Sequence, residues 1–195
     1  MKRLFDIVFS LIGILMLLPI GIILGILVKF GSKGPVFYLQ QRVGKNNVDF
    51  GLYKFRTMFT DSDKKGLLTV GNKDNRITKT GGFLRKYKLD ELPQLLNVLF
   101  GDMSLVGPRP EVRKYVDLYD QEQIQVLNVR PGITDYASLE YFEENRILGE
   151  SNDPEKTYIE EVMPAKLLLN MKYINKNGLF IDVKIILLTL KKIVS

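Results

Sequence analysis

An uncharged apolar run near the N-terminus constrains this chain more than any other feature. From Ile7 to Val28, twenty-two consecutive residues carry no charge. As a straight helix with a rise of ~1.5 Å per residue, the run would be roughly 33 Å long, enough to cross the hydrocarbon core of a bilayer. A cleaved signal peptide needs small residues at a cleavage site, whereas this run continues apolar into Lys29. A buried core helix of this character would need a larger protein around it. The run therefore predicts a membrane segment.

Basic residues flank this run on both sides and leave two topologies open. Lys2 and Arg3 precede it and Lys29 follows it, so the tendency of positive charge to stay in the cytoplasm applies to both ends. A simple span satisfies only one end. Pro19 removes a backbone hydrogen bond near the middle, so a helix that breaks there and returns to the same face would satisfy both, provided that protein covers the freed carbonyl groups. We expect Asp6 to pair with Lys2 or Arg3 at the interface.

Composition restricts the chemistry of the rest of the chain. The 195 residues suffice for an anchor, residues 1–32, and one domain with its own core, residues 33–195. Neither His nor Cys is present, which excludes disulfides, thiolate zinc sites, cysteine nucleophiles and the commonest general base. Carboxylates and oxygen-bound Mg²⁺ are left as the natural chemistry. The formal net charge of +6 favours anionic partners such as phosphorylated substrates or acidic lipids, and no nucleic-acid-binding motif is recognisable.

The domain combines a small β element with several amphipathic helices, which predicts a mostly helical α+β fold. Two segments rich in β-branched and aromatic residues, Val36–Val43 and Phe50–Met58, predict a hairpin. The second strand presents Lys54 and Arg56 on one face, either as a phosphate site or as an ordinary solvated face. Residues 60–81 predict a loop. A turn is predicted over Arg130–Thr134, and helices over Phe83–Phe100, Glu111–Asn128, Tyr158–Tyr173 and Leu179–Val194.

The last of these helices, Leu179–Val194, has two possible places in the fold. Phe180, Val183, Leu187 and Leu190 share one apolar face with Val194, and Lys191 and Lys192 lie near its end. It is therefore either a core helix or one that lies on the membrane surface.

Two adjacent acids open the helix predicted over Phe83–Phe100. Pro93 implies that this helix starts or kinks close to Asp90, because proline is tolerated only in a first turn. Asp90 and Glu91 are then either a helix cap and a first-turn acid, or a reactive pair. Arg109 lies between two prolines, and its restricted guanidinium is either suited to forked contact with phosphate or merely exposed on a stiff turn. The spacing alone leaves both interpretations open.

Several blocks of sequence resemble the bacterial sugar transferases, the monotopic phosphoglycosyl transferases. The blocks keep the order found in that family, cover nearly the whole chain, and correspond to its minimal catalytic form. They are Lys2–Asp6, Gly34–Phe37, Gln41–Gly44, Tyr53–Met58, Leu89–Leu95, Asn97–Leu99, Gly101–Pro110 and Arg130–Thr134.

The resemblance implies transfer of a phosphosugar from a UDP-sugar to a polyprenyl phosphate such as undecaprenyl phosphate, giving a polyprenyl-diphospho-sugar and UMP. This is the first membrane step of polysaccharide or glycoprotein assembly. It implies that Asp90 is the nucleophile, forming an aspartyl-phosphosugar ester, and that Glu91 acts with it and shares Mg²⁺. Substrate phosphates would be bound by Arg109, Lys54, Arg56 and Arg130.

The resemblance also implies a re-entrant membrane helix broken at Pro19, which places residues 33–195 as a catalytic domain on the cytoplasmic face of the inner membrane. Two departures stand out. The serine that often precedes this proline is Leu18 here, and many members continue Gly-x-Ala-Gln where this chain has Asp135–Ser138. The sequence therefore does not assign the sugar, and the oligomeric state is left open. The alternative function is a membrane-anchored scaffold that binds acidic lipid and has no catalytic activity.

Overall fold

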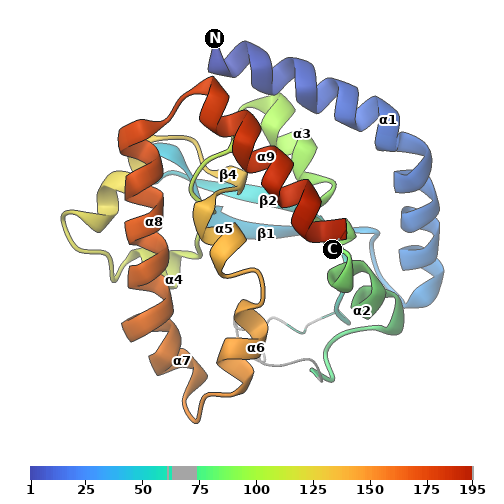
Figure 1. Cartoon of the computed structure of the whole chain (residues 1–195). Helices are drawn as coiled ribbons and strands as arrows, with labels where there is room; N and C mark the ends of the chain where they lie inside the picture. The colour runs from blue at the N-terminus through green and yellow to red at the C-terminus, as the bar shows by residue number, and fades with distance from the viewer. Residues whose placement is uncertain (61, 63–73, 195) are drawn as a thin grey trace.

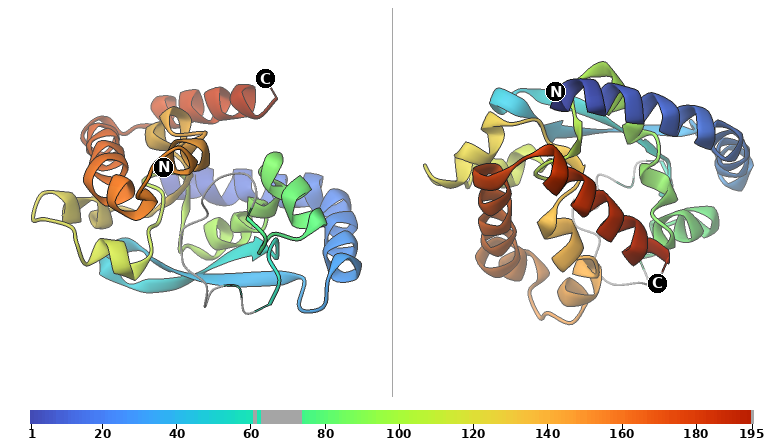
Figure 2. Two further views of the ribbon diagram at one scale, coloured as in Figure 1. Left: turned by 90° about the horizontal axis from the view of Figure 1, so that it is seen from below. Right: turned by 45° about the horizontal axis from the view of Figure 1, so that its top comes forward.

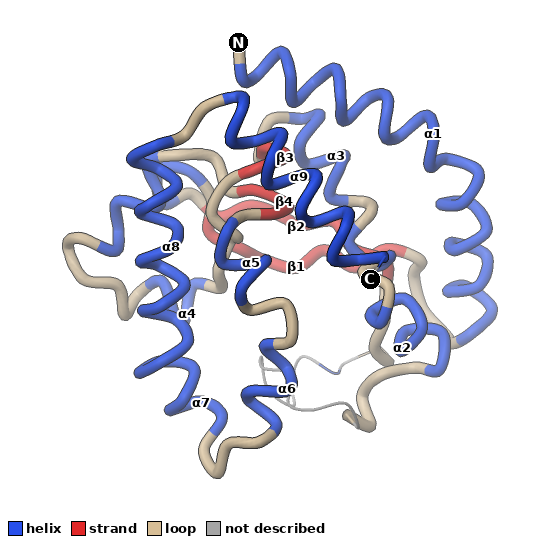
Figure 3. Tube along the Cα trace, viewed as in Figure 1, coloured by secondary structure: helices blue, strands red, loops and turns tan. Residues whose placement is uncertain are grey.

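The computed structural model of the chain describes residues 1–60, 62 and 74–194. Helices predominate within these ranges and two pairs of short strands complete the fold, so the predicted mostly helical α+β class is confirmed (Figure 3). The greater part of the loop predicted over residues 60–81 lies outside the described residues.

Helix α1, Lys2–Gly31, contains the predicted membrane segment. Pro19 lies inside this helix, and the ribbon turns sharply in its middle part without interruption (Figure 1). A proline produces such a bend because it removes one backbone hydrogen bond and its ring displaces the preceding turn. By length and composition α1 could cross a membrane, and only 11% of its most apolar window is buried inside the protein.

The second half of α1 packs on the domain that follows it. Leu24 and Val28 are buried against Phe55 and Leu84, which lie in the hairpin and in the helix after it. Burial of a large aliphatic or aromatic side chain contributes about 1.5–3 kcal/mol. The C-terminal half of α1 is therefore part of the hydrophobic core.

The predicted hairpin is confirmed. Strands β1, Phe37–Val43, and β2, Asp49–Phe55, pair antiparallel. The connection is a short 3₁₀ turn, Lys45–Asn47, in which Asn46 and Asn47 adopt positive φ angles of 58° and 62°. Asparagine tolerates this left-handed conformation better than most residues.

A second, parallel pair of strands was not predicted. Strand β3, Ser104–Val106, pairs with β4, Gly132–Thr134, so the predicted turn over Arg130–Thr134 is wrong for its last three residues. The two chains approach so closely that a Cβ atom on Gly132 would lie 2.0 Å from the backbone nitrogen of Gly107. Only glycine permits this approach, which brings the segment after β3 against the segment around β4.

The first turn of α1 is bound to strand β3. The buried Asp6 carboxylate accepts hydrogen bonds from the Ser104 hydroxyl at 3.0 Å and from the Leu105 backbone at 3.1 Å. The predicted pairing of Asp6 with Lys2 or Arg3 is therefore wrong. Lys2 donates to Asp182 and Arg3 to the Val98 carbonyl oxygen instead, and the donors of the strand satisfy the Asp6 carboxylate directly.

The helix predicted over Phe83–Phe100 is divided into three pieces. These are α2, Lys79–Lys86, the 3₁₀ turn η3, Leu89–Glu91, and α3, Gln94–Phe100. Lys88 adopts a left-handed conformation with φ 54°, and Pro93 cannot donate a backbone hydrogen bond. The prediction of one continuous helix is wrong, whereas the predicted kink beside the acid pair is confirmed.

The segment predicted as one helix over Glu111–Asn128 is also divided. Helix α4, Arg113–Val116, is followed by a separate 3₁₀ segment, Gln123–Asn128. The Asp120 carboxylate accepts hydrogen bonds from two backbone amides of the later segment at 2.8 Å and so starts a new helical turn.

The C-terminal third of the chain is helical and covers the side opposite the hairpin (Figure 2). A π-helical turn over Tyr158–Val162 joins α7 to α8, and the predicted helix over Tyr158–Tyr173 is confirmed. The helices are α5, Tyr136–Glu140, α6, Glu144–Gly149, α7, Pro154–Thr157, α8, Met163–Lys176, and α9, Leu179–Val194.

Helix α9 is divided lengthwise between core and surface. Asp182 and Ile185 are fully buried, whereas Phe180 is 86% exposed and Leu187 and Leu190 are exposed with it. The face that the sequence marks as apolar is thus the exposed one. The core alternative is therefore confirmed for one face of the helix, whereas the membrane-surface alternative stays a prediction for the exposed apolar face.

Candidate active site

Two cations hold Glu91 between strand β2 and the segment that follows β3. The Arg109 guanidinium donates Nη1 to Oε2 at 3.1 Å and also donates Nη2 to Oε1. Lys54 of β2 lies 3.5 Å from the same Oε1 atom. A forked arginine–carboxylate contact fixes both groups more firmly than a single ion pair does. The structure therefore brings together three of the predicted site residues.

The neighbouring carboxylate is in a different state. Asp90 is only 7% exposed, and its carboxylate receives no hydrogen bond from any residue that the structure describes. Burial, and then the adjacent charge of Glu91, raises the pKa of Asp90. Burial also tends to raise the pKa of Glu91, but Arg109 and Lys54 outweigh it and hold that pKa well below its usual range. Two adjacent acids thus have opposite electrostatic environments.

Lys54 is tuned by the same surroundings. Burial lowers the pKa of its ammonium group to about 8, against the opposing effect of Glu91. Lys54 therefore changes charge within the pH range of an ordinary enzyme assay, unlike a typical surface lysine.

Helix α3 fixes the position of the acid pair relative to β2. The buried Asn97 side chain donates to the Gly51 carbonyl oxygen at 2.8 Å and accepts from the Tyr53 backbone amide at 2.9 Å. Both contacts lie just before Lys54 in the strand. Asn97 was noted in the sequence only as part of a matched block, and its function is to anchor this helix to the hairpin.

Arg56 does not join the cluster. Its buried guanidinium donates to the carbonyl oxygens of Val28 at 3.2 Å and Ser32 at 2.8 Å, and also to that of Lys33. It therefore caps the C-terminal end of α1. The alternation of side chains that pairs Arg56 with Lys54 fails because β2 ends at Phe55. The predicted phosphate contact of Arg56 does not fit this placement.

Arg130 also makes no hydrogen bond or ion pair with the acid pair. Its Nε donates to the Gly101 carbonyl oxygen at 2.8 Å, and this contact is exposed. Its predicted contact with substrate phosphate remains a prediction.

A cation that the sequence analysis did not select lies near Asp90. Arg85 of α2 donates Nε to the Thr57 hydroxyl at 2.9 Å, and its charge is among those that oppose the raised pKa of Asp90. Arg85 had no signal in the sequence, because the pattern predicted one continuous helix, whereas α2 ends at Lys86 and Lys88 adopts a left-handed conformation before the acids.

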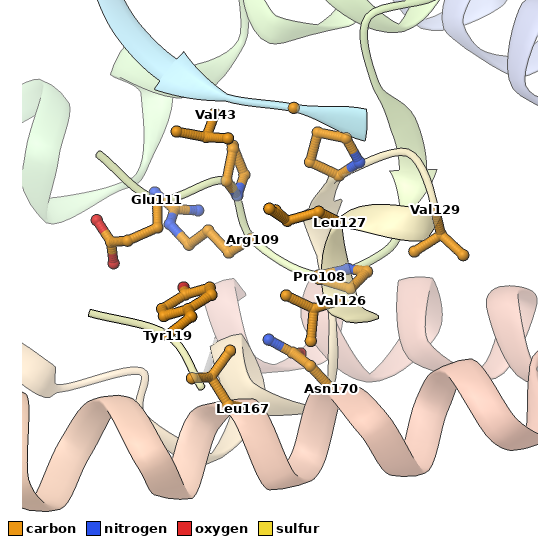
Figure 4. A pocket seen from close by; sticks show the side chains of 13 residues that line it. Val43, Pro108, Arg109, Glu111, Tyr119, Val126, Leu127, Val129, Leu167 and Asn170 are labelled. Carbon is orange, nitrogen blue, oxygen red and sulfur yellow. The ribbon is translucent and has the colours of Figure 1, made fainter. Parts of the chain in front are cut away.

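The small cavity nearest to Arg109 is not a substrate pocket. It is lined by Arg109, Glu111, Tyr119, Leu167 and Asn170, among others, and neither member of the acid pair lines it (Figure 4). Its volume of about 20 Å³ admits roughly one water molecule. A nucleotide sugar is far larger, so this space serves the packing of the segment rather than recognition.

The acid pair is the candidate site for the predicted Mg²⁺. Within the described part of the chain, no group of three or more His, Cys, Asp or Glu residues could hold a metal ion. Both oxygens of Glu91 already contact Arg109 or Lys54, whereas those of Asp90 accept no hydrogen bond from the residues that the structure describes. Mg²⁺ is commonly bound by one or two carboxylates together with substrate phosphates. The residues present fit Mg²⁺ in that manner, with the remaining ligands coming from substrate.

Comparison with known proteins shows which family the chain belongs to. The model of the family described as "Bacterial sugar transferase" matches residues 1–195. The chain is 39% identical over 197 residues to the UDP-N-acetylgalactosamine-undecaprenyl-phosphate N-acetylgalactosaminephosphotransferase of Aeromonas hydrophila, covering 100% of this chain and 44% of that relative. It is 35% identical over 195 residues to the UDP-glucose:undecaprenyl-phosphate glucose-1-phosphate transferase of Escherichia coli (strain K12), covering 98% and 40%.

A shorter relative matches over most of its length. The uncharacterized sugar transferase EpsL of Bacillus subtilis (strain 168) is 39% identical over 198 residues, which cover 99% of this chain and 87% of the relative. The chain spans less than half the length of the Aeromonas and Escherichia relatives. Because the family model covers every residue and these relatives align over nearly the whole sequence, the chain belongs to the bacterial sugar transferase family.

Proposed function

We propose that this protein is a phosphoglycosyl transferase that moves a phosphosugar from a UDP-sugar to a membrane polyprenyl phosphate, releasing UMP. The observation that carries the proposal is the contrast between two adjacent carboxylates. Asp90 is buried with no hydrogen bond from the described residues, whereas Glu91 is held by Arg109 and Lys54. The names of the Aeromonas and Escherichia relatives, which specify undecaprenyl phosphate as acceptor and UDP-linked sugars as donors, support the same reaction.

In the first step, an oxygen of Asp90 attacks the phosphorus atom that carries the sugar. A new oxygen–phosphorus bond forms to Asp90, and the bond from this phosphorus to the bridging oxygen breaks, so that UMP leaves with the electron pair. The product is a phosphosugar ester of Asp90. A carboxylate that accepts no hydrogen bond from the described residues is suited to this attack, in contrast to Glu91, which Arg109 holds by both oxygens.

In the second step, a phosphate oxygen of the polyprenyl phosphate attacks the same phosphorus and displaces the Asp90 carboxylate. This forms the polyprenyl-diphospho-sugar and restores the enzyme. A phosphate monoester with a second pKa of about 6 is largely ionised at neutral pH, so the acceptor needs little base catalysis. A chain without histidine is therefore equipped for this chemistry.

Fixed cations offset the repulsion between a carboxylate and a diphosphate. Arg109 and Lys54 both contact the Glu91 side chain. They are placed to stabilise charge that develops on the phosphates. When bound, Mg²⁺ would supply a further positive charge to offset the negative charge of the substrate phosphates, and Asp90 and Glu91 would be its protein ligands.

The attachment of α1 at both ends supports a re-entrant anchor. Its first turn is bound to β3 through Asp6, and its last turn is capped by Arg56 and packed through Val28. Both ends therefore contact one globular domain, whereas a spanning helix separates its ends by about 30 Å of hydrocarbon. We place this domain on the cytoplasmic face of the inner membrane, with the exposed apolar face of α9 at the interface.

The reaction is tested by a screen of UDP-sugars for UMP release, with Asp90→Asn and the wild type side by side. The wild type should release UMP with at least one sugar and become covalently labelled when no acceptor is present. Asp90→Asn should do neither, while remaining in the membrane fraction. Turnover by Asp90→Asn would overturn the nucleophile, and full turnover in excess EDTA would overturn Mg²⁺.

The topology is tested separately in sealed vesicles. Single cysteines at residues 2 and 33 should react with an impermeant thiol reagent from the same side. Labelling from opposite sides would establish a spanning helix and overturn re-entry.

A further inference from the structure

The segment that carries Arg109 has a single backbone donor. Pro108 and Pro110 have no backbone N–H group. The Arg109 amide is therefore the only backbone group of residues 108–110 that can donate a hydrogen bond. That amide donates to Oδ2 of Asp135 at 3.1 Å. The other oxygen, Oδ1, accepts from the Ser138 amide at 2.6 Å and caps α5. One carboxylate thus joins the arginine backbone to the start of a helix.

Strand pairing brings Asp135 to this position. It directly follows β4, and the Gly107 amide donates to the Thr134 carbonyl oxygen at 3.0 Å, while the Gly132 amide donates to the Pro108 carbonyl oxygen at 2.9 Å. Asp135 is fully buried. A buried carboxylate is costly unless its oxygens are satisfied, and here two backbone amides satisfy them. The group is therefore placed with high geometric precision rather than left as an exposed helix cap.

The two ends of Arg109 are held by different acids. Its backbone amide contacts Asp135, and its guanidinium contacts Glu91 beside the proposed nucleophile. A shift of the backbone carries the guanidinium with it, because the proline on each side restricts compensating rotation of the chain. Small displacements of a group that stabilises developing charge have large effects on rate.

We propose that Asp135 is a positioning residue for the reaction: it acts through the Arg109 amide and sets where the guanidinium meets Glu91 and the substrate phosphates. The proposal rests on the proposed function, since it assigns the consequence of a displaced Arg109 to phosphoryl transfer. It does not require Asp135 to touch the substrate.

The decisive test is a double-mutant cycle on UMP release with an active UDP-sugar. Asp135→Asn presents an NH₂ group to one of the two amides that the carboxylate now accepts from. We expect kcat/KM to fall roughly ten- to hundredfold, with kcat affected. In an Arg109→Lys background the same change should cost less than about twofold, because a residue that acts through Arg109 has no further effect once that side chain is replaced.

A matched control separates this role from capping. Asp153 is exposed and caps α7 by accepting a hydrogen bond from the Lys156 amide at 3.1 Å. It makes no hydrogen bond to Arg109. Asp153→Asn should leave kcat/KM within about twofold of the wild type. If Asp135→Asn does not fold, Asp135→Ser replaces it, since a serine hydroxyl can still cap α5 but is too short to reach the Arg109 amide.

The outcomes distinguish the two proposals. Failure of the wild type to release UMP from any UDP-sugar overturns the proposed function. An active wild type with undiminished kcat/KM in Asp135→Asn or Asp135→Ser overturns the positioning role. An effect of equal size with and without Arg109→Lys also overturns it, because it would show that Asp135 acts by another route.

Discussion

The Arg109 guanidinium binds both carboxylate oxygens of Glu91, and this contact separates two acids that are adjacent in the chain. Glu91 is stabilised as an anion, and Asp90 is left in a buried site without a donor from the described residues. A pair that the sequence presents as equivalent is therefore divided into a fixed charge and a buried carboxyl group with a raised pKa.

Replacing Glu91 should damage both the fold and the activity. In Glu91→Gln, Lys54 loses its anionic partner and Arg109 keeps one acceptor oxygen in place of two. We expect UMP release to fall roughly a hundredfold and the free energy of unfolding to fall by about 3 kcal/mol, since removing one partner strands the other charges in a mostly buried site. Thermal unfolding in detergent and initial rates measure the two effects. An unchanged Tm would show that the clamp contributes nothing to stability.

Replacing Asp90 should have the opposite effect on stability. The pKa of Asp90 is raised above its ordinary value of 3.8, so the folded state favours the protonated form. The protein therefore loses stability as pH rises from the pKa of the unfolded carboxyl group through the higher pKa of the folded one. Asp90→Asn removes the charge. We expect its Tm at pH 7.5 to equal or exceed that of the wild type, with the advantage disappearing near pH 4, where the unfolded carboxyl is itself about half protonated.

One result of comparing Asp90→Asn with the wild type would contradict this prediction. A Tm for Asp90→Asn that lies below the wild type at pH 7.5 would mean that ionised Asp90 is stabilised by partners. Loss of activity with unchanged or raised Tm is the pattern of a residue kept for function at a cost in stability.

Lys54 should set the alkaline limit of the reaction. Burial lowers its pKa to about 8, so its positive charge is lost as pH rises through that value. We expect the rate of UMP release without acceptor to fall above about pH 8. In Lys54→Arg the guanidinium stays charged, and the alkaline limb should move upward by at least one pH unit. An unchanged limb in that variant would assign the titration to another group.

The omission of acceptor in that assay matters. A polyprenyl phosphate titrates near pH 6 and would add its own limb to the acidic side of a complete reaction. A single turnover that stops at the aspartyl ester reports only groups of the enzyme and the donor.

Arg56 should prove structural. Its guanidinium satisfies carbonyl oxygens at the end of α1, so Arg56→Met leaves buried acceptors without donors. We expect the free energy of unfolding to fall by about 1–3 kcal/mol, while the KM for the UDP-sugar stays within about twofold of the wild type. A tenfold higher KM at unchanged Tm would return Arg56 to the phosphate site that the sequence predicted.

The sequence predicted what depends on local pattern. The long apolar run, the hairpin and the last helix are recognisable because their periodicity or composition is continuous over many residues. The kink at the acid pair was predictable for the same reason, since Pro93 acts on its immediate neighbours.

Contacts between distant residues were beyond that reasoning. The pairing of β3 with β4 joins segments separated by more than twenty residues, and only this pairing brings Asp135 to the Arg109 amide. The capping role of Arg56 depends on where β2 ends, and the role of Asp6 depends on a strand that the sequence did not indicate. Short strands of three residues have too little pattern to be predicted, although they position the site.

Helices α1 and α9 are joined by an ion pair between the half-buried Lys2 and the buried Asp182, which should hold the membrane helix to the domain. Lys2 donates to Asp182 of α9 at 2.5 Å, and the Tyr173 hydroxyl donates to the same carboxylate at 2.6 Å. Asp182 is fully buried, so Lys2→Met leaves its charge with a single neutral donor. We expect the free energy of unfolding to fall by about 2 kcal/mol. Lys2→Met combined with Asp182→Asn should recover at least half of that loss, because the stranded charge is then gone. Thermal unfolding of the single and double variants measures this coupling, and strictly additive losses would show that the two side chains do not interact in the folded protein.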